Sequence, residues 1–372
     1  MPGASSSAAR THRCWPSRAA FTSTSTRHSS VTRTRAPADR VRRSIAPGVS
    51  LAIARRLTGI WYSKSPPPRL LRAASALYQR AVRDRLARPP GKPPCPVIVV
   101  GNLVAGGSGK TPVVAALAAS LSAAGYAVSI ITRGYGGGAG VRPVRVGSGS
   151  CAADVGDEAL ELHAGTGRPV WVCRKRDAAL AAALSDGAQV VLSDDGLQHT
   201  ALPRSFEICV VDARRGLGNG YCLPAGPLRQ PADRLRTVDM VLVKRTPDGA
   251  DGDFPGAAFD LEGGELEPII GQAPPPVPPA QIDALAGIAD PESFFEALAL
   301  RGFRLRRHPL VDHQPITAEM LAALPGPVVL TGKDRMRLPP HEREDLFVLP
   351  VRARLPEEVL QRIAAHVREF ST

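Results

Sequence analysis

The stretch VIVVGNLVAGGSGKTPVV, residues 97–114, decides the fold class of this chain. A β-branched apolar run enters a glycine-rich turn, and Lys110 and Thr111 then open a second apolar run. A strand, a glycine-rich turn and a helix in this order are how a phosphate-binding loop is built. The commonest form of that loop has a glycine six residues before the lysine, where this chain has Val104. The departure removes no group that touches phosphate.

Six consecutive residues of the turn are candidates for binding a nucleotide. Glycines leave the main-chain N–H groups free to face phosphate, and the positive end of the following helix favours an anion. We expect Lys110 to reach the β- and γ-phosphate oxygens as a catalytic group, and the Thr111 hydroxyl to ligate Mg²⁺. The nucleotide-binding candidates are Gly106, Gly107, Ser108, Gly109, Lys110 and Thr111.

From residue 96 onward, short apolar strands alternate with helices. Such strands are typical of a buried parallel sheet. We therefore predict an α/β fold, with a doubly wound, mostly parallel sheet of the P-loop NTPase type over residues 96–272. The predicted strands are 96–100, 127–131, 169–173, 189–193, 206–212 and 239–243, and the predicted helices are 112–124, 155–164 and 176–186.

The last quarter of the chain reads as a separate unit. The segment APPPVPPA at 273–280 is a linker by its composition. Beyond it we predict a second, smaller α/β domain over 281–372. Its expected helices are 291–300, 317–323 and 356–368, and its expected strands are 303–307 and 327–330.

The net charge of +13 is concentrated near the N-terminus. Residues 1–95 contain 19 Lys and Arg against Asp39 and Asp84, a balance of +17, so the rest of the chain carries −4. Residues 1–47 are rich in Ser, Thr and Arg. We expect them to form a disordered basic extension, which is either an organellar transit peptide or the product of a start codon assigned too far upstream.

The basic segment 48–95 contains leucines at helical spacing over 68–88, with arginines on the other faces. This pattern predicts an amphipathic helix. The helix either packs against the core of the protein or lies in an anionic membrane surface. The sequence leaves both alternatives open.

The composition excludes several classes of protein. No apolar run approaches the roughly 18–20 residues needed to cross a bilayer. The six scattered cysteines form no C-x-x-C pair, which is typical of a reducing compartment rather than a disulfide framework. The positive charge lies in a tail without interleaved aromatic residues, so we expect no nucleic-acid partner. The sequence indicates no obligate protein partner.

Acidic residues follow two of the predicted elements. Asp194 and Asp195 end the strand at 189–193, and the carboxyl ends of strands are where an open α/β sheet binds its ligands. They are candidates for holding Mg²⁺, or else belong to a polar turn. Asp157 begins a helix after a glycine. It is a candidate base for an acceptor hydroxyl, although the same position suits a residue that only caps the helix.

Several motifs in a fixed order carry a family resemblance. The first part of the chain contains GGSGKTP (106–112), ITRGYGG (131–137), VGDEAL (155–160), LSDDGLQH (192–199) and LGNGYCLPAGPLRQP (217–231). The later part adds AGIADPESFFEAL (286–298), LVDHQPIT (310–317) and TGKDRMRL (331–338). Together they resemble the tetraacyldisaccharide 4′-kinases of lipid A biosynthesis over roughly residues 55–365. In that family the position of Val104 does not require glycine.

The resemblance implies that ATP, with Mg²⁺, phosphorylates the 4′-hydroxyl of a tetraacylated glucosamine disaccharide 1-phosphate. The implied partners are this anionic glycolipid and the membrane surface, at the cytoplasmic face of the bacterial inner membrane, to which the enzyme binds peripherally. By motif position, the implied catalytic residues are Asp157, His313 and Lys110. The implied metal-binding residues are Thr111, Asp194, Asp195 and Gln230, and the substrate-binding candidates are Arg133, Gln198, His199, Asn219 and Arg229. For Arg133 and Arg229, ordinary turn chemistry is the alternative.

The chain departs from the family pattern in three places. Gln230 and Gly332 each stand where the family usually has glutamate, and Gln314 stands where it often has a histidine or an aromatic residue. The first change predicts weaker binding of Mg²⁺. Other classes remain open from the motifs alone. They are a P-loop switch or partitioning ATPase, which has no use for an acceptor base, and a soluble small-molecule kinase of similar fold.

Overall fold

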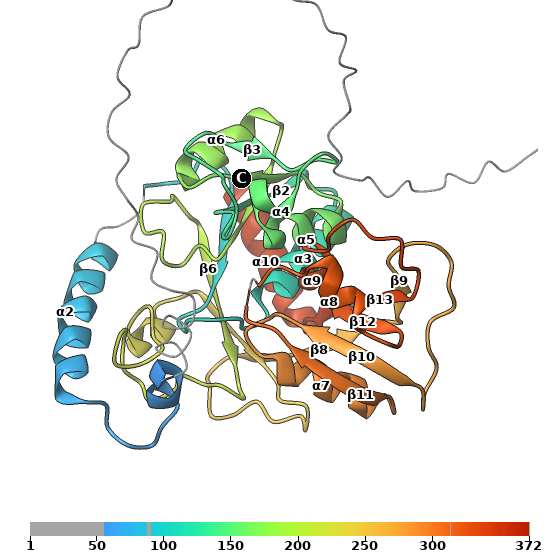
Figure 1. Ribbon diagram of the computed structural model, residues 1–372. Helices are drawn as coiled ribbons and strands as arrows, with labels where there is room; N and C mark the ends of the chain where they lie inside the picture. The colour runs from blue at the N-terminus through green and yellow to red at the C-terminus, as the bar shows by residue number, and fades with distance from the viewer. Residues whose placement is uncertain (1–55, 88–90, 313, 372) are drawn as a thin grey trace, which may run out of the picture.

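The computed structural model describes residues 56–87, 91–312 and 314–371, which form two β-sheets with helices around them (Figure 1). The expectations for residues 1–47 and for His313 lie outside these ranges. The larger sheet has nine strands in the order β14-β8-β7-β6-β1-β5-β2-β4-β3. Their bounds are β1 Val97–Gly101, β2 Val128–Thr132, β3 Val144–Arg145, β4 Val170–Val172, β5 Val190–Asp194, β6 Phe206–Asp212, β7 Met240–Lys244, β8 Ala257–Gly263 and β14 Val351–Arg354.

The strand order determines where the site lies. The strands from β8 to β4 are parallel, and only the edge strands β14 and β3 pair antiparallel. Strand β1 lies between β5 and β6, so the chain winds in opposite directions on its two sides. A crevice opens beyond the carboxyl ends of the strands at such a switch point. The predicted doubly wound P-loop fold is confirmed.

Helices cover both faces of this sheet because successive side chains of each strand point to opposite sides. In β1, Ile98 and Val100 belong to one core, and Val97 and Val99 to the other. The first core is completed by α3, α5 and α10, the second by α6. The helices around the sheet are α2 Arg69–Leu86, α3 Lys110–Ala123, α4 Ala152–Val155, α5 Asp157–Thr166, α6 Arg176–Ser185, the 3₁₀ helix η1 Ala232–Arg236 and α10 Glu357–Ser371.

The smaller sheet has the order β11-β10-β12-β13-β9 and lies beside the larger one, at the lower right of Figure 1. Its four longer strands are parallel, and β9 is an antiparallel edge. Its elements are β9 Glu267–Pro268, β10 Gln281–Ala286, α7 Pro291–Leu300, β11 Arg304–Pro309, α8 Ala318–Ala322, β12 Val328–Thr331, α9 Gly332–Arg335 and β13 Leu346–Leu349.

The two ends of the smaller unit differ from the predicted bounds of 281–372. Strand β9 joins the smaller sheet before the proline-rich segment 273–280, so that segment lies within the unit. At the other end, Leu349 closes β13 and Val351 opens β14 of the larger sheet. Helix α10 then buries its apolar stripe in the core of the larger sheet. An amphipathic pattern predicts a helix but does not say which core it covers.

The predicted elements are otherwise confirmed, with ends that differ by three residues or fewer. The sequence analysis missed the longer strands β8, β10, β13 and β14, the two-residue strands β3 and β9, and the short helices α4, α9 and η1. Strand β10 contains Asp283 and two alanines, and β8 has no β-branched residue, so both lack the composition that marks a strand. Pairing with neighbouring strands of the same sheet determines them instead.

The basic helix α2 lies at the left edge of Figure 1. It buries Ser75 and Val82 on one face and exposes leucines on another. The Ser75 hydroxyl donates to the Cys222 carbonyl at 2.7 Å, and the Tyr78 hydroxyl donates to the Arg229 carbonyl at 3.0 Å. Leu70 and Leu77 remain 85% and 73% exposed. The helix is therefore packed on the core along the face of Ser75 and Tyr78, and the membrane alternative concerns only its exposed face. Among the described residues, no helix combines the length and the apolar character needed to cross a bilayer.

Candidate active site

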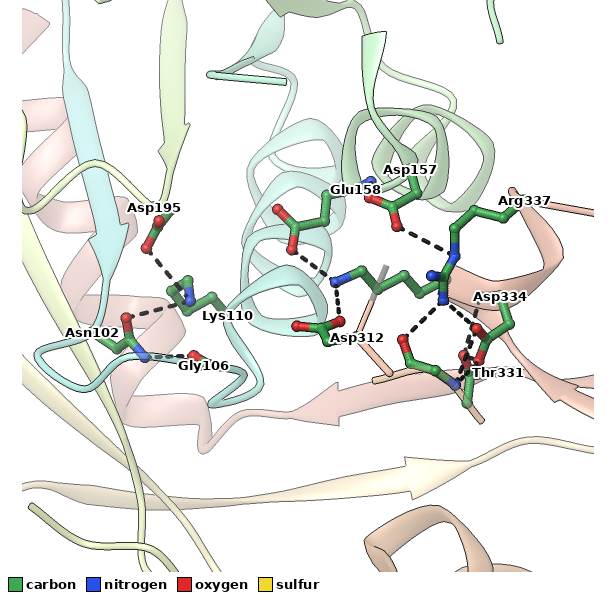
Figure 2. Close-up of polar contacts among 12 residues, drawn as sticks. Asn102, Gly106, Lys110, Asp157, Glu158, Asp195, Asp312, Thr331, Asp334 and Arg337 are labelled. Carbon is green, nitrogen blue, oxygen red and sulfur yellow. Dashed lines mark hydrogen bonds and ion pairs between the residues drawn. The ribbon is translucent and has the colours of Figure 1, made fainter. Parts of the chain in front are cut away.

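The glycine-rich loop between β1 and α3 has the geometry of a phosphate-binding loop. Gly106 and Gly109 have φ of 104° and 85°, a region that favours glycine, and Gly109 directly precedes the first turn of α3. The Asn102 amide donates to the Gly106 carbonyl at 3.1 Å (Figure 2). The loop is thus held open at the amino end of a fourteen-residue helix, where main-chain N–H groups favour an anion.

Val104 pairs with the 217–231 segment at the start of the loop. It forms an isolated antiparallel bridge with Leu228, and the next amide, of Ala105, donates to the Pro227 carbonyl at 2.8 Å. The start of the loop is therefore extended and tied to the 217–231 segment. This pairing explains why the common glycine is dispensable here.

Lys110, the first residue of α3, points back toward the end of β5 (Figure 2). Its Nζ lies 3.4 Å from the Asn102 Oδ1 atom and 3.4 Å from the Asp195 Oδ1 atom. The Arg229 guanidinium also binds Asp195, at 2.9 and 3.1 Å from its two carboxylate oxygens. Burial alone would raise the pKa of Asp195, but Lys110 and Arg229 hold it well below its usual range.

Asp194 lies in a different environment from its neighbour. It is 1% exposed, and its Oδ1 atom has no hydrogen-bond partner within the described residues. Burial and the nearby Glu158 raise the pKa of Asp194 to about 7, although Lys110 opposes both. A carboxylate that is buried and lacks a full set of partners is suited to receiving a cation.

Gln230 is also buried, at 2% exposed, and lies beneath the loop that follows β5. Its amide donates to the Leu197 carbonyl at 3.0 Å, while its Oε1 atom has no partner in the described part of the chain. Asp194 and Gln230 therefore each have an unpaired buried oxygen. Oxygen ligands of this kind suit Mg²⁺, which takes one or two protein carboxylates and completes its shell with phosphate and water. The described ranges contain no group of three or more His, Cys, Asp or Glu able to hold a metal alone.

Asp157 begins α5, directly after Gly156, whose φ of 86° turns the chain between α4 and α5. The carboxylate is 3% exposed. Its Oδ1 atom accepts the Glu158 amide at 2.9 Å, and its Oδ2 atom lies 3.5 Å from the Arg337 Nε atom of the smaller unit (Figure 2). Gly156, not Asp157, is the N-cap of α5, so capping does not account for this carboxylate, to which the second sheet unit supplies a cation.

The substrate-binding candidates divide into three groups. Gln198 donates to the Asn102 carbonyl at 2.8 Å and, with Arg229, joins the Lys110 and Asp195 cluster. Arg133 is exposed just beyond β2. It lies close enough to His199 to affect it: burial, Arg176 and Arg133 together lower the pKa of His199 to about 4, so the imidazole is neutral at pH 7.

Asn219 differs from its predicted role. Its amide nitrogen donates to the Ile60 and Ala225 carbonyls at 3.1 and 3.0 Å, and its oxygen accepts the Tyr221 amide at 3.2 Å. Both amide hydrogens are used inside the loop, so the side chain holds the N-terminal segment against this loop and offers no donor to a substrate.

Two arginines that the sequence analysis missed hold the site together. Arg176, at the start of α6, is 3% exposed and donates to the Asp194 carbonyl at 2.7 Å. It supports the turn where Asp195 has a φ of 48°, the one positive φ outside glycine in the described residues. Arg215 donates to the carbonyls of Ala105 and Gly107 at 3.3 and 3.1 Å. Neither arginine belongs to a sequence motif with a known function, so only the structure shows that they contact the site.

A glycine-rich loop with a lysine, at the switch point of a parallel sheet and opposite acidic residues, defines a P-loop enzyme that acts on nucleotide phosphates. The model of one protein family, tetraacyldisaccharide-1-P 4′-kinase, matches residues 68–368. The chain therefore belongs to this family, and the predicted resemblance is confirmed.

Individual relatives agree. The chain is 42% identical over 326 residues to the tetraacyldisaccharide 4′-kinase of Alkalilimnicola ehrlichii, covering 83% of this chain and 96% of that one. It is 38% identical over 320 residues to the enzyme of the same name from Pseudomonas aeruginosa, covering 82% and 94%. The crystal structure of LpxK from Aquifex aeolicus in complex with ATP matches with a TM-score of 0.63 and 25% identity, covering 79% of this chain and 97% of that one. These matches favour a kinase and give no support to a P-loop switch.

Proposed function

We propose that this protein transfers the γ-phosphoryl group of ATP to the 4′-hydroxyl of a tetraacylated glucosamine disaccharide 1-phosphate. The observation that carries the proposal is the family match over residues 68–368, in a chain that retains the Lys110 loop and a buried acid at Asp157. The related crystal structure holds ATP, which supports ATP as the phosphoryl donor here.

The phosphate-binding loop contributes mainly position and charge. Phosphoryl transfer passes through a loose transition state with charge spread over the equatorial oxygens, so electrostatic stabilisation supplies most of the rate. Main-chain N–H groups from Gly106 to Thr111 would hold the β- and γ-phosphates, and Lys110 would neutralise the charge that develops on them. Asn102 and Asp195 keep the Lys110 ammonium near the mouth of the loop before nucleotide binds.

Asp157 is the proposed base for the 4′-hydroxyl. A sugar hydroxyl is a weak acid, so its proton is taken up late, as the metaphosphate-like group is captured. The prediction that His313 supports this carboxylate remains part of the proposal. The imidazole would orient the carboxylate and share its proton.

Mg²⁺ is the proposed metal cofactor, held by the Thr111 hydroxyl, Asp194, Asp195 and Gln230. The unpaired buried oxygens of Asp194 and Gln230 fit this assignment, whereas Asp195 is already paired with two cations. When bound, the ion neutralises charge on the β- and γ-phosphates. The amide of Gln230 offers an oxygen without the charge that a glutamate would add.

For the substrate, we propose that Arg133 and the neutral His199 bind near the acceptor sugar, with Gln198 and Arg229 closer to the nucleotide. Arg133 is exposed and positively charged, which suits the phosphate of an anionic glycolipid. His199 carries no charge at pH 7, so it suits a sugar hydroxyl better than a phosphate.

The test is the transfer of labelled phosphate from ATP to a tetraacyl-disaccharide 1-phosphate in detergent micelles, comparing the wild type with Asp157→Asn. We expect transfer by the wild type and a loss of about 10²-fold or more in the variant. No transfer by a wild type that still hydrolyses ATP would contradict the proposed function. Equal transfer by the variant would leave the kinase assignment intact and remove Asp157 as base.

We further propose that the protein binds the cytoplasmic face of the inner membrane peripherally, through α2. Leu70 and Leu77 are one heptad apart on the exposed face of the helix, and Arg69, Arg72 and Arg80 beside them are exposed as well. Leucines between arginines suit the boundary between acyl chains and anionic headgroups. The inner face of the helix stays anchored by Ser75 and Tyr78.

Sedimentation with vesicles that contain anionic lipid tests this proposal. Leu70→Ser with Leu77→Ser should reduce binding by about tenfold, and added salt should weaken the wild type further. A matched control is Leu300→Ser, because Leu300 is 78% exposed at the far end of α7. Equal reduction by the control and the α2 double variant would contradict a specific role for α2.

A further inference from the structure

The segment 331–337 forms a hydrogen-bonded corner of the smaller unit, facing α5. The Asp334 side chain is fully buried, and its Oδ2 atom accepts the Thr331 hydroxyl at 2.6 Å and the Gly287 amide at 3.0 Å. The Thr331 hydroxyl in turn accepts the Asp334 amide at 3.1 Å, which caps α9. These contacts hold the start of the segment in place, and so determine where the Arg337 side chain lies.

Arg337 extends from this corner to the proposed base. Its side chain is 8% exposed and pairs with Asp334. One terminal nitrogen donates to the Gly287 carbonyl at 2.9 Å, and the other to the Gln314 carbonyl at 3.1 Å. The Nε atom, which has no hydrogen-bond partner within the described residues, lies 3.5 Å from the Asp157 Oδ2 atom (Figure 2). One guanidinium therefore joins the smaller sheet and the Asp157 carboxylate of the larger unit.

A second cation from the same segment binds the next residue of α5. The Lys333 Nζ atom lies 3.3 Å from the Glu158 carboxylate and 3.2 Å from the Asp312 carboxylate. Lys333 and Arg337 thus form ion pairs with Glu158 and Asp157, two consecutive residues of α5, across the two units. The smaller unit reaches the first turn of α5 with both of them.

We propose that Arg337 is a positioning residue for Asp157, which it keeps oriented and ionised only while the smaller unit is seated against α5. The inference rests on the proposed function, in which Asp157 is the base. A carboxylate that is 3% exposed is costly to keep charged unless a cation and hydrogen bonds accompany it. Since the cation comes from the second unit, docking of the units and competence of the base are coupled.

The charged groups around Asp157 decide what a pH measurement would report. They include Glu158 and Glu161 on α5, and Lys333 and Arg337 from the smaller unit. His313, the proposed partner of Asp157, would titrate in the same measurement. The acids disfavour ionisation of Asp157, and the cations favour it. Removing the Arg337 charge shifts this balance toward the protonated, inactive form.

The experiment compares the wild type with Arg337→Met and Arg337→Lys in the phosphate-transfer assay, across pH 5.5–9. We expect Arg337→Met to lower kcat by about 10–100-fold with little change in the KM for ATP, because the phosphate-binding loop is untouched. The acidic limb of the kcat profile should move to higher pH. Arg337→Lys keeps a cation and should recover most of kcat and the original acidic limb.

A matched control is Arg343→Met. Arg343 lies in the same unit and donates to the Leu324 carbonyl at 2.8 Å while pairing with Asp345 at 2.6 Å. Within the described part of the chain, it makes no hydrogen bond or ion pair with α5. If Arg337 were only a structural link, Arg343→Met would lower kcat as much as Arg337→Met and neither would move the acidic limb. That result would overturn the proposal.

Asp157→Asn in the same assay distinguishes the role of Asp157 as the base from the role of Arg337 in positioning it. An inactive Asp157→Asn together with a fully active Arg337→Met refutes the positioning role and leaves the base intact. A fully active Asp157→Asn refutes the base itself. Circular dichroism and thermal melts of each variant establish that the proteins compared are folded.

Discussion

Glu161 offers a prediction about stability that follows from where α5 meets the smaller unit. Its carboxylate lies over Gly332, so close that a Cβ built on that glycine would come within 2.8 Å of the Oε1 atom. Burial raises the pKa of Glu161 and Lys333 lowers it; with the smaller effects of Glu158, Asp157 and Asp194, which raise it, the result is a pKa of about 8. We predict that Glu161→Gln stabilises the protein at alkaline pH and has little effect at acidic pH.

The sign follows from proton binding by the two states. An unfolded glutamate ionises near pH 4.5, whereas the folded one holds its proton until about pH 8. The contribution of Glu161 to the free energy of unfolding is therefore fully present below pH 4.5 and is lost as the pH rises through 8. A tenfold change in proton affinity is worth about 1.4 kcal/mol, so the full difference would be about 5 kcal/mol. The side chain is partly exposed, and solvent screening reduces this to about 2 kcal/mol.

Thermal melts of the wild type and Glu161→Gln at pH 5 and pH 9 measure this directly. A gain of about 2 kcal/mol corresponds to a rise in Tm of about 3 °C at pH 9 for a protein of this size. At pH 5 the two proteins should melt within about 1 °C of each other. Glu358→Gln is a matched control because Glu358 is exposed in the first turn of α10. A Tm difference between wild type and Glu161→Gln that is the same at both pH values would refute the reasoning.

Three further predictions concern the site. Gly106→Ala places a Cβ on a residue with φ of 104°, within 2.8 Å of the Arg215 side chain. We expect kcat/KM for ATP to fall by about 10–100-fold in steady-state assays. An unchanged value would contradict the prediction that ATP binding depends on this loop conformation. Gln230→Glu adds charge beside an unpaired buried oxygen, so the Mg²⁺ concentration for half-maximal rate should fall by about fivefold, and an unaltered Mg²⁺ titration would refute Gln230 as a ligand. Burial, with Arg176 and Arg133, lowers the pKa of His199 to about 4. Between pH 6.5 and pH 4 the unfolded state therefore binds a proton that the folded state does not, and the wild type should lose about 1 kcal/mol of stability, after allowance for the partial exposure of His199. In chemical denaturation, the free energy of unfolding of His199→Gln should fall less over that interval. An equal fall in both proteins would contradict the prediction that His199 is held neutral in the folded state.

The sequence determined the features that depend on short stretches of chain. The glycines before Lys110, the apolar strands and the acids at the end of β5 are local signals, because loop geometry and strand propensity act over a few residues. The ordered motifs also indicated the family, which the match over residues 68–368 confirmed. The fold class and the family could therefore be predicted from the sequence without the structure, and the roles of the site residues stay predictions.

Only the tertiary structure decided which distant residues meet. Nothing in the sequence places β14 and α10 with the larger sheet, because an amphipathic helix can cover either core. The contacts of Arg176 with Asp194, and of Arg337 with Asp157, join different elements and depend on how whole sheets are seated. Asn219 is the reverse case, where a polar residue in a glycine-rich loop is used inside the fold. Side-chain type limits the chemistry a residue can perform, but its packed neighbours determine which of those roles it has.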